Sequence, residues 1–83
     1  MPLVITITPN PGLVHRPVSI SVAGASCDPH DVKVSRGTVV LETFEENDGA
    51  SSQNTFVPTQ TGGHTVTVVC GEDEEGSITF DVN

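Results

Sequence analysis

The most reactive side chains in the sequence belong to two cysteines, Cys27 and Cys70. Such a pair can form a disulfide, remain as two buried thiols in a reducing compartment, or supply thiolates to a metal ion. Cys27 and His30 have the C-x-x-H spacing of a zinc-ligand pair, and Cys70 could add a third ligand. Zinc normally takes four ligands, and only Asp28 or Glu72 is left for the fourth position. We therefore expect no metal site.

Two acidic clusters, at residues 45–48 and 72–75, raise the question of calcium binding. Calcium takes about six to eight oxygen ligands, and neither cluster matches the D-x-[DN]-x-[DN]-G pattern of an EF-hand loop. An acidic loop is more often a solvated segment or an electrostatic docking surface. We expect the second cluster to contact a partner protein. Its residues are Glu72, Asp73, Glu74 and Glu75.

The three histidines, His15, His30 and His64, lie near predicted turns, and we expect them to be exposed loop residues. A cysteine beside a histidine can act as a nucleophile with its general base, and His30 could approach either cysteine. A cysteine that has a disulfide partner on so small a scaffold is a poor nucleophile candidate. We therefore expect no catalytic residue and no cofactor.

Length, charge and composition exclude several classes of protein. The chain has 83 residues, enough for one core and too few for a second domain. Three Lys and Arg against eleven Asp and Glu give a net charge of -8 at pH 7, the wrong sign for binding nucleic acid or an anionic membrane. No segment approaches the roughly 18–20 apolar residues of a membrane-spanning helix. The lack of Trp and Tyr disfavours carbohydrate binding, because sugars stack on aromatic rings.

The N-terminal segment from Met1 to Pro9 has no basic region, no long apolar stretch and no small-residue cleavage site, unlike a signal peptide. We therefore expect either a protein that is made and kept inside the producing cell or an excised piece of something larger. The last predicted strand ends at Val82, one residue before the end of the sequence. No stretch of the sequence has the composition of a linker between domains. We expect a single domain over residues 1–83.

The elements that must position these side chains are strands, because the apolar segments are short, β-branched and alternate with polar residues. Seven such segments, with a turn signal about every 8–12 residues and no helical pattern, predict an all-β, immunoglobulin-like antiparallel β-sandwich. A small barrel is the alternative. In the fourth segment, the continuous apolar run Val39-Val40-Leu41 leaves two registers open. The predicted strands are Leu3–Thr8, Pro17–Ala23, Val32–Val34, Thr38–Phe44, Asn54–Val57, Gly63–Cys70 and Gly76–Val82.

This architecture favours a disulfide between Cys27 and Cys70. The second and sixth strands of such a sandwich lie in opposite sheets and run toward the same end, so the two cysteines can meet. On the chain-entropy model the bond would contribute about 3–4 kcal/mol. Cys27 is out of phase with the inward residues of the second strand, so we expect a bulge near Gly24 to turn it inward.

The aromatic residues Phe44, Phe56 and Phe80 are expected to anchor a core that is otherwise built from Val, Ile and Leu. Antibody domains pack a Trp against their disulfide, and this sequence has none. The chain therefore departs from the antibody pattern.

The segment from Phe56 to Val68 resembles the passage between the fifth and sixth strands of bacterial and bacteriophage immunoglobulin-like domains. Those domains often read as an apolar residue, Pro, a polar turn with Gly and then an alternating strand. The opening segments Ile5–Pro9 and Pro17–Val22 resemble the first two strands of the same group. The resemblance covers most of the chain through generic motifs, and it implies the sandwich fold.

For a chain without an export signal, the resemblance also implies a virion role, because stand-alone domains of this kind occur as head decoration proteins of tailed bacteriophages. The expected function is then capsid decoration. The protein would be made in the host cytoplasm without a signal peptide and would dock on the major capsid protein lattice at the virion surface, where it would stabilise the head or aid attachment. The sequence lacks the extra anchoring segment of two-part decoration proteins, so the sandwich itself would have to dock. Alternatives are a module of a phage tail protein or bacterial surface adhesin, and a small metal-dependent or thiol enzyme.

Docking would use sheet edges and charge, because the chain has few aromatic anchors for a large apolar interface. The strands Leu3–Thr8 and Ser77–Val82 are near the termini and are expected to be edges that can add to a partner sheet. The acidic cluster at residues 72–75 adjoins the second of these strands and could face a basic patch.

Overall fold

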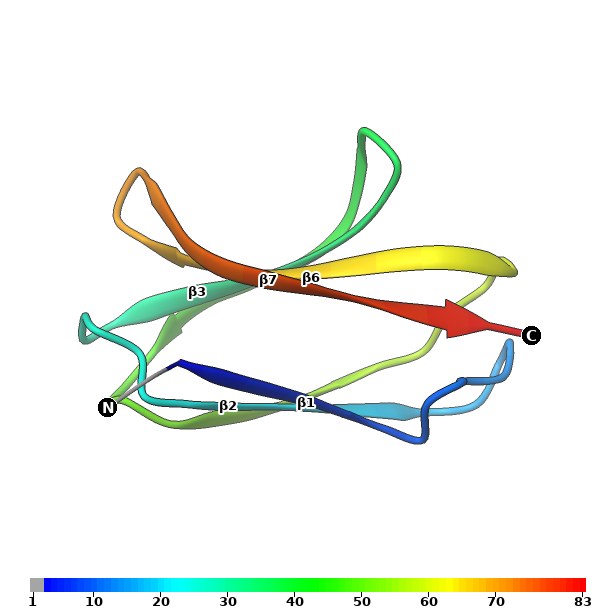
Figure 1. Cartoon of the computed structure of the whole chain (residues 1–83), viewed down its shortest axis with the longest axis horizontal. Helices are drawn as coiled ribbons and strands as arrows, with labels where there is room; N and C mark the ends of the chain where they lie inside the picture. Colours follow the sequence, from blue (N-terminus) through cyan, green and yellow to red (C-terminus); the bar gives the residue numbers. More distant parts are fainter. Residues whose placement is uncertain (1–2) are drawn as a thin grey trace.

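The computed structural model describes residues 3–83 and shows two antiparallel sheets packed face to face (Figure 1). One sheet has three strands in the order β1-β2-β5, and the other has four in the order β4-β3-β6-β7. This confirms the predicted immunoglobulin-like sandwich of seven strands. The strands are β1 (Val4–Thr8), β2 (Val18–Ala23), β3 (His30–Arg36), β4 (Val39–Asn47), β5 (Ser52–Phe56), β6 (Gly62–Cys70) and β7 (Asp73–Val82).

The centre of the core consists of alternate residues from the central strands of both sheets, and residues of β1, β5 and β7 complete it. On β2, every second residue from Val18 to Val22 is buried, and the facing β3 and β6 pair so that Val32 lies opposite Val68 and Val34 opposite Val66. A fully buried valine contributes about 1.5–3 kcal/mol relative to an exposed one, so these positions dominate the stability.

The three phenylalanines differ in their burial. Phe56 and Phe80 are buried, as expected, with 7% and 2% of their surfaces exposed. Phe44, on the edge strand β4, is only half-buried and packs against the side of the core. The prediction that all three anchor the core is therefore confirmed for Phe56 and Phe80 and wrong for Phe44, which lies at the margin of the core.

The register of β4 explains why its apolar run could not be assigned to one face. Phe44 pairs with Val32 on β3, but after an irregularity Val40 pairs with Ser35, and Leu41 falls at the shift. Leu41 packs against the core, whereas Val39 and Val40 are exposed by 59% and 51%. The run therefore divides between core and solvent.

Both hairpins of the four-stranded sheet are longer than predicted. β4 extends to Asn47 and β7 begins at Asp73, so most residues of the two expected acidic loops lie in strands. Gly71, with φ of 65°, allows a tight turn between β6 and β7. In Figure 1 the tips of the β3–β4 and β6–β7 hairpins both rise away from the three-stranded sheet.

One side of the sandwich is closed by the chain between β1 and β2. The Gly12 amide donates to the Asp81 carbonyl at 2.8 Å, and the Asn83 amide donates to the Gly12 carbonyl at 2.8 Å. Gly12 suits this approach, since a Cβ there would lie 3.0 Å from Val18 Cγ2 and the valine side chain would have to move. Thus β7, although it is an edge strand, is paired at its C-terminal end.

Candidate functional site

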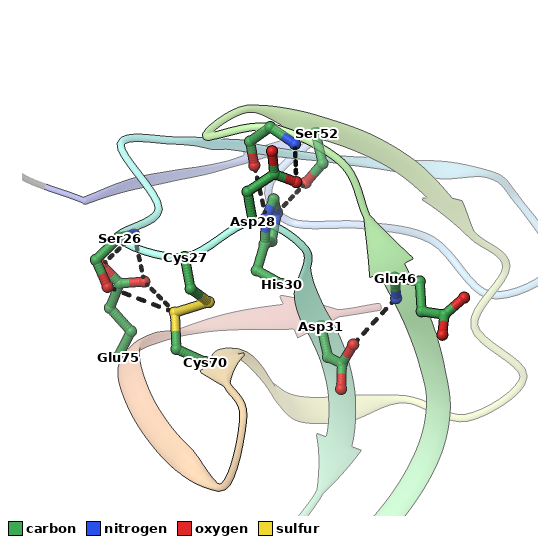
Figure 2. The surroundings of a disulfide bond; sticks show 10 residues. Ser26, Cys27, Asp28, His30, Asp31, Glu46, Ser52, Cys70 and Glu75 are labelled. Carbon is green, nitrogen blue, oxygen red and sulfur yellow. Dashed lines mark hydrogen bonds between the residues drawn. A yellow bond between two sulfur atoms is a disulfide. The ribbon is translucent and has the colours of Figure 1, made fainter.

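The disulfide between Cys27 and Cys70 lies at one end of the sandwich, with a Cα–Cα distance of 5.7 Å (Figure 2). It joins the loop after β2 to the last residue of β6, and so links the two sheets as predicted. The expected bulge near Gly24 is wrong, because β2 ends at Ala23 with no register shift. Gly24 instead turns the chain with φ of 81°, and beyond the strand the alternation no longer restricts Cys27.

Glu75 holds the loop that carries Cys27 against β7. Its two carboxylate oxygens accept the Ser26 amide at 3.0 and 2.9 Å, and Oε1 lies 3.1 Å from Cys70 Sγ. A disulfide sulfur has no proton to donate, so this last approach is a contact between a sulfur and a carboxylate. The β6–β7 register shifts at this point, with Glu74 opposite Val69 and Gly76 opposite Val68, so Glu75 is the extra residue of a bulge.

His30 is the buried centre of the neighbouring hydrogen-bond network. Only 1% of its surface is exposed, Nδ1 lies 3.1 Å from the Gly49 carbonyl, and Nε2 lies 2.9 Å from Ser52 Oγ. Since a carbonyl can only accept, Nδ1 carries the proton and donates it, and Nε2 accepts from the serine hydroxyl. Both nitrogens are therefore used to fix the connection between β4 and β5.

Two aspartates bind backbone amides, one in this connection and one near the end of β4. Asp28 Oδ1 accepts the Gly49 amide at 2.7 Å, and Asp31 Oδ1 accepts the Glu46 amide at 3.1 Å. Figure 2 shows these contacts arranged around the disulfide. The candidate zinc ligands of the sequence, Cys27, His30 and Cys70, are brought to one end of the molecule but are occupied by the disulfide and by structural hydrogen bonds.

His64 is also buried, with no exposed surface, between Phe56 and Phe80 at ring-centre distances of 6.2 and 5.3 Å. Its Nδ1 donates to the Gly62 carbonyl at 2.9 Å, while Nε2 has no hydrogen-bond partner among the described residues. The expectation of exposed loop histidines is thus wrong for His30 and His64 and right for His15.

A signal for both buried histidines was present in the sequence. His30 is two residues before the inward Val32, and His64 is two residues before the inward Val66. Side chains two apart on a strand share a face, so each histidine continues a core stripe. Glu75 gave no such signal, because its role depends on a bulge and on a loop from the other sheet.

The predicted contact residues are not equivalent in the folded chain. Glu72, Asp73 and Glu74 are exposed at the β6–β7 hairpin. Glu75 is half-buried and bound to the Ser26 amide. Only the first three carboxylates are available to a partner.

A hollow of about 410 Å³ lies beside the Ser26–Glu75 contact. Glu75 is the one ionisable residue in its lining, and the rest are small. Across residues 3–83, no three His, Cys, Asp or Glu side chains are grouped so that they could hold a metal ion. The lining residues are Ala23, Gly24, Ala25, Ser26, Ala50, Ser51 and Glu75.

No family model matches this chain, and searches of curated proteins and of solved structures give no significant match. In the described part of the chain, no helix is long and apolar enough to cross a membrane.

Proposed function

We propose that this protein is a non-enzymatic binding module that docks on a repeating protein shell, most specifically as a decoration protein on the major capsid protein lattice of a bacteriophage head. The observation that carries the proposal is a contrast within the molecule. Its potentially reactive side chains, Cys27, Cys70 and His30, are all bound internally, whereas a group of carboxylates is exposed at a hairpin tip.

The exposed group, which we call the acidic tip, consists of Glu72, Asp73 and Glu74. It lies on a hairpin that rises away from the three-stranded sheet (Figure 1). The hairpin base is fixed by Glu75 and by the disulfide, so its carboxylates are held on a rigid support. Such a surface suits a basic patch on a partner, and complementary charge speeds and orients association.

The alternative of a thiol enzyme is less well supported. A nucleophilic cysteine must be a thiolate, and both cysteines are joined to each other. The alternative of a tail-protein or adhesin module shares the same physical features and differs only in the structure to which the module attaches.

The test is occupancy on purified capsids of the source virus, measured across about 0.05–0.5 M salt, a range over which the screening length shortens severalfold. Changing Glu72, Asp73 and Glu74 to Gln, Asn and Gln should lower the occupancy and flatten its salt dependence. The matched control changes Glu42, Glu45 and Glu46 on β4 to Gln, which removes the same charge elsewhere. Equal occupancy for all three proteins would reject the acidic tip as the contact, and binding of the wild type to tails alone would favour the tail-protein alternative.

A further inference from the structure

The charges of this acidic chain are absent from one entire sheet. None of the three Lys and Arg or eleven Asp and Glu lies in β1, β2 or β5. The outer face of this sheet carries short hydroxyl and amide side chains, including Thr6, Ser21 and Gln53 in one cross-strand row. By contrast, β3, β4 and β7 all carry charged residues. Two copies of a chain with net charge -8 repel each other. They can approach most easily through a surface that carries no carboxylates.

The strand β5 is a regular, open edge of that sheet. It pairs with β2 from Val18–Phe56 to Val22–Ser52 without any shift, and within residues 3–83 no strand pairs with its other side. Its contact with β4 includes a side-chain hydrogen bond, in which Asn54 Nδ2 donates to Asn47 Oδ1 at 3.4 Å, and this bond leaves the backbone groups of β5 unused. Constant-type immunoglobulin domains fill the equivalent place with a fourth strand. Edge strands are usually blunted by charge, proline or bulges, and β5 has none of these.

The other edges are protected. β4 has carboxylates and two register shifts, and β7 has carboxylates, a bulge and the pairing to Gly12. β1 lies on the closed side, where Leu3 packs so tightly on β7 that a Cβ on Gly76 would be 2.6 Å from it. β5 is therefore the edge most open to another chain.

We propose that β5 pairs with β5 of a second copy of this chain, joining two three-stranded sheets into one six-stranded antiparallel sheet. A two-fold axis at Asn54 places Ser52 opposite the partner's Phe56 and Gln53 opposite the partner's Thr55. All five facing positions are uncharged, so no like charges oppose each other along the strand. Identical edges are self-complementary, as a two-fold dimer requires.

The ends of β5 carry complementary charges for this arrangement. Asp48 lies in the connection that leads into its first residue and is exposed. At its far end, where Phe56 pairs with Val18, Arg16 is exposed two residues before β2 begins. A second cation, Arg36 of β3, donates its Nε–H to the Thr61 carbonyl at 3.1 Å in the connection that follows β5. Antiparallel pairing turns the acidic end of each copy toward the cationic end of the other. This complementarity selects a second copy over an arbitrary extended segment.

Sedimentation equilibrium of the full chain at about 0.15 M salt tests the proposal, since this salt screens charges beyond about 8 Å. We expect a reversible monomer–dimer equilibrium. The double variant Gln53→Glu with Thr55→Glu places like charges opposite each other across the axis and should raise the dimer dissociation constant about tenfold or more. The variant Gln53→Lys with Thr55→Glu places Lys opposite the partner's Glu and should restore dimerisation to within about threefold of wild type.

The matched control is Thr6→Glu with Thr8→Glu, which adds two negative charges to the same sheet face but on β1. It should leave the dissociation constant within about threefold of wild type. A wild-type chain that stays monomeric up to about 1 mM would overturn the proposal without any variant. It would also be overturned if the Lys–Glu and Glu–Glu pairs weakened the dimer equally, or if the β1 control weakened it as much.

A cross-linking measurement does not depend on those variants. Asn54 lies on the proposed axis, and identical residues facing each other there have Cα atoms about 4.5–5.5 Å apart, within reach of a disulfide. Asn54→Cys should therefore give a covalent dimer when oxidised glutathione takes up the two electrons, and Thr6→Cys should not. The tests of dimerisation and of shell docking have separate outcomes. A monomeric protein that binds capsids would overturn only the proposed dimer. A dimeric protein that does not bind capsids would overturn only the proposed docking function.

Discussion

The two sheets of this sandwich differ in how they meet solvent. The four-stranded sheet carries charged residues on β3, β4 and β7 and has register shifts at both of its edges. The three-stranded sheet has no charge and pairs without any shift. Charge and bulges both discourage unwanted strand pairing. The difference indicates that one sheet is protected against association and the other is built to allow it.

Internal contacts join the two sheets at opposite ends of the sandwich. The disulfide ties them at one end, where Glu75 from the four-stranded sheet holds the loop that leaves the three-stranded sheet. At the opposite end, Gly12 bridges to Asp81 and Asn83. The two sheets, which differ in charge, are therefore joined at both ends, and the following changes test the core between them and the disulfide end.

The largest effect is expected in the aromatic core. Phe80→Ala removes a ring with 2% exposure and should cost about 3–5 kcal/mol of unfolding free energy, close to the whole stability of a small domain. Phe44→Ala, on the half-buried edge strand β4, should cost clearly less. Urea unfolding monitored by circular dichroism measures both. Equal losses would mean that β4 is packed as tightly as β7.

Removing the disulfide comes next. Changing Cys27 and Cys70 together to Ser should lower the unfolding free energy by about 3–4 kcal/mol, because the 43-residue separation between them no longer restricts the unfolded chain. Wild-type protein unfolded in excess reductant is the control and should match the double variant. A loss below about 1 kcal/mol would show that other contacts hold the two sheets together.

The two buried histidines should respond differently to substitution. His30→Leu leaves the Gly49 carbonyl and Ser52 hydroxyl without their partner, which should cost about 1–3 kcal/mol. His64→Phe removes the unpartnered Nε2 but also the donor to Gly62, and these opposing effects should leave the stability within about 1 kcal/mol of wild type. Thermal unfolding compares the two, and a larger loss for His64→Phe would contradict this assignment.

These histidines show what the sequence could predict. Alternation fixed which residues of β2, β3 and β6 face the core, and applied one step further it would have placed His30 and His64 there too. The role of Glu75 could not be found in this way, because a bulge places it and its partner Ser26 is 49 positions away. The division of Val39-Val40-Leu41 likewise depends on an irregular pairing that alternation cannot describe.

The smallest expected effect concerns the chemistry of the disulfide. A reducing thiolate is negatively charged, and the Glu75 carboxylate lies 3.1 Å from Cys70 Sγ, so its charge should slow attack on this bond. Glu75→Gln keeps an oxygen that can accept the Ser26 amide and removes the charge. It should therefore speed reduction by dithiothreitol a few-fold, roughly the effect of one nearby charge that is partly screened by water.

The matched control is Glu74→Gln, an exposed neighbour that changes the net charge by the same amount. It should alter the rate by less than about half as much, because an exposed carboxylate is screened by solvent. Trapping free thiols at timed intervals and measuring intact mass gives both rates. If the disulfide is reduced equally fast in the two variants, the net charge of the chain controls its reduction. If reduction is faster only in Glu75→Gln, the single carboxylate beside Cys70 protects the disulfide that joins the charged sheet to the uncharged one.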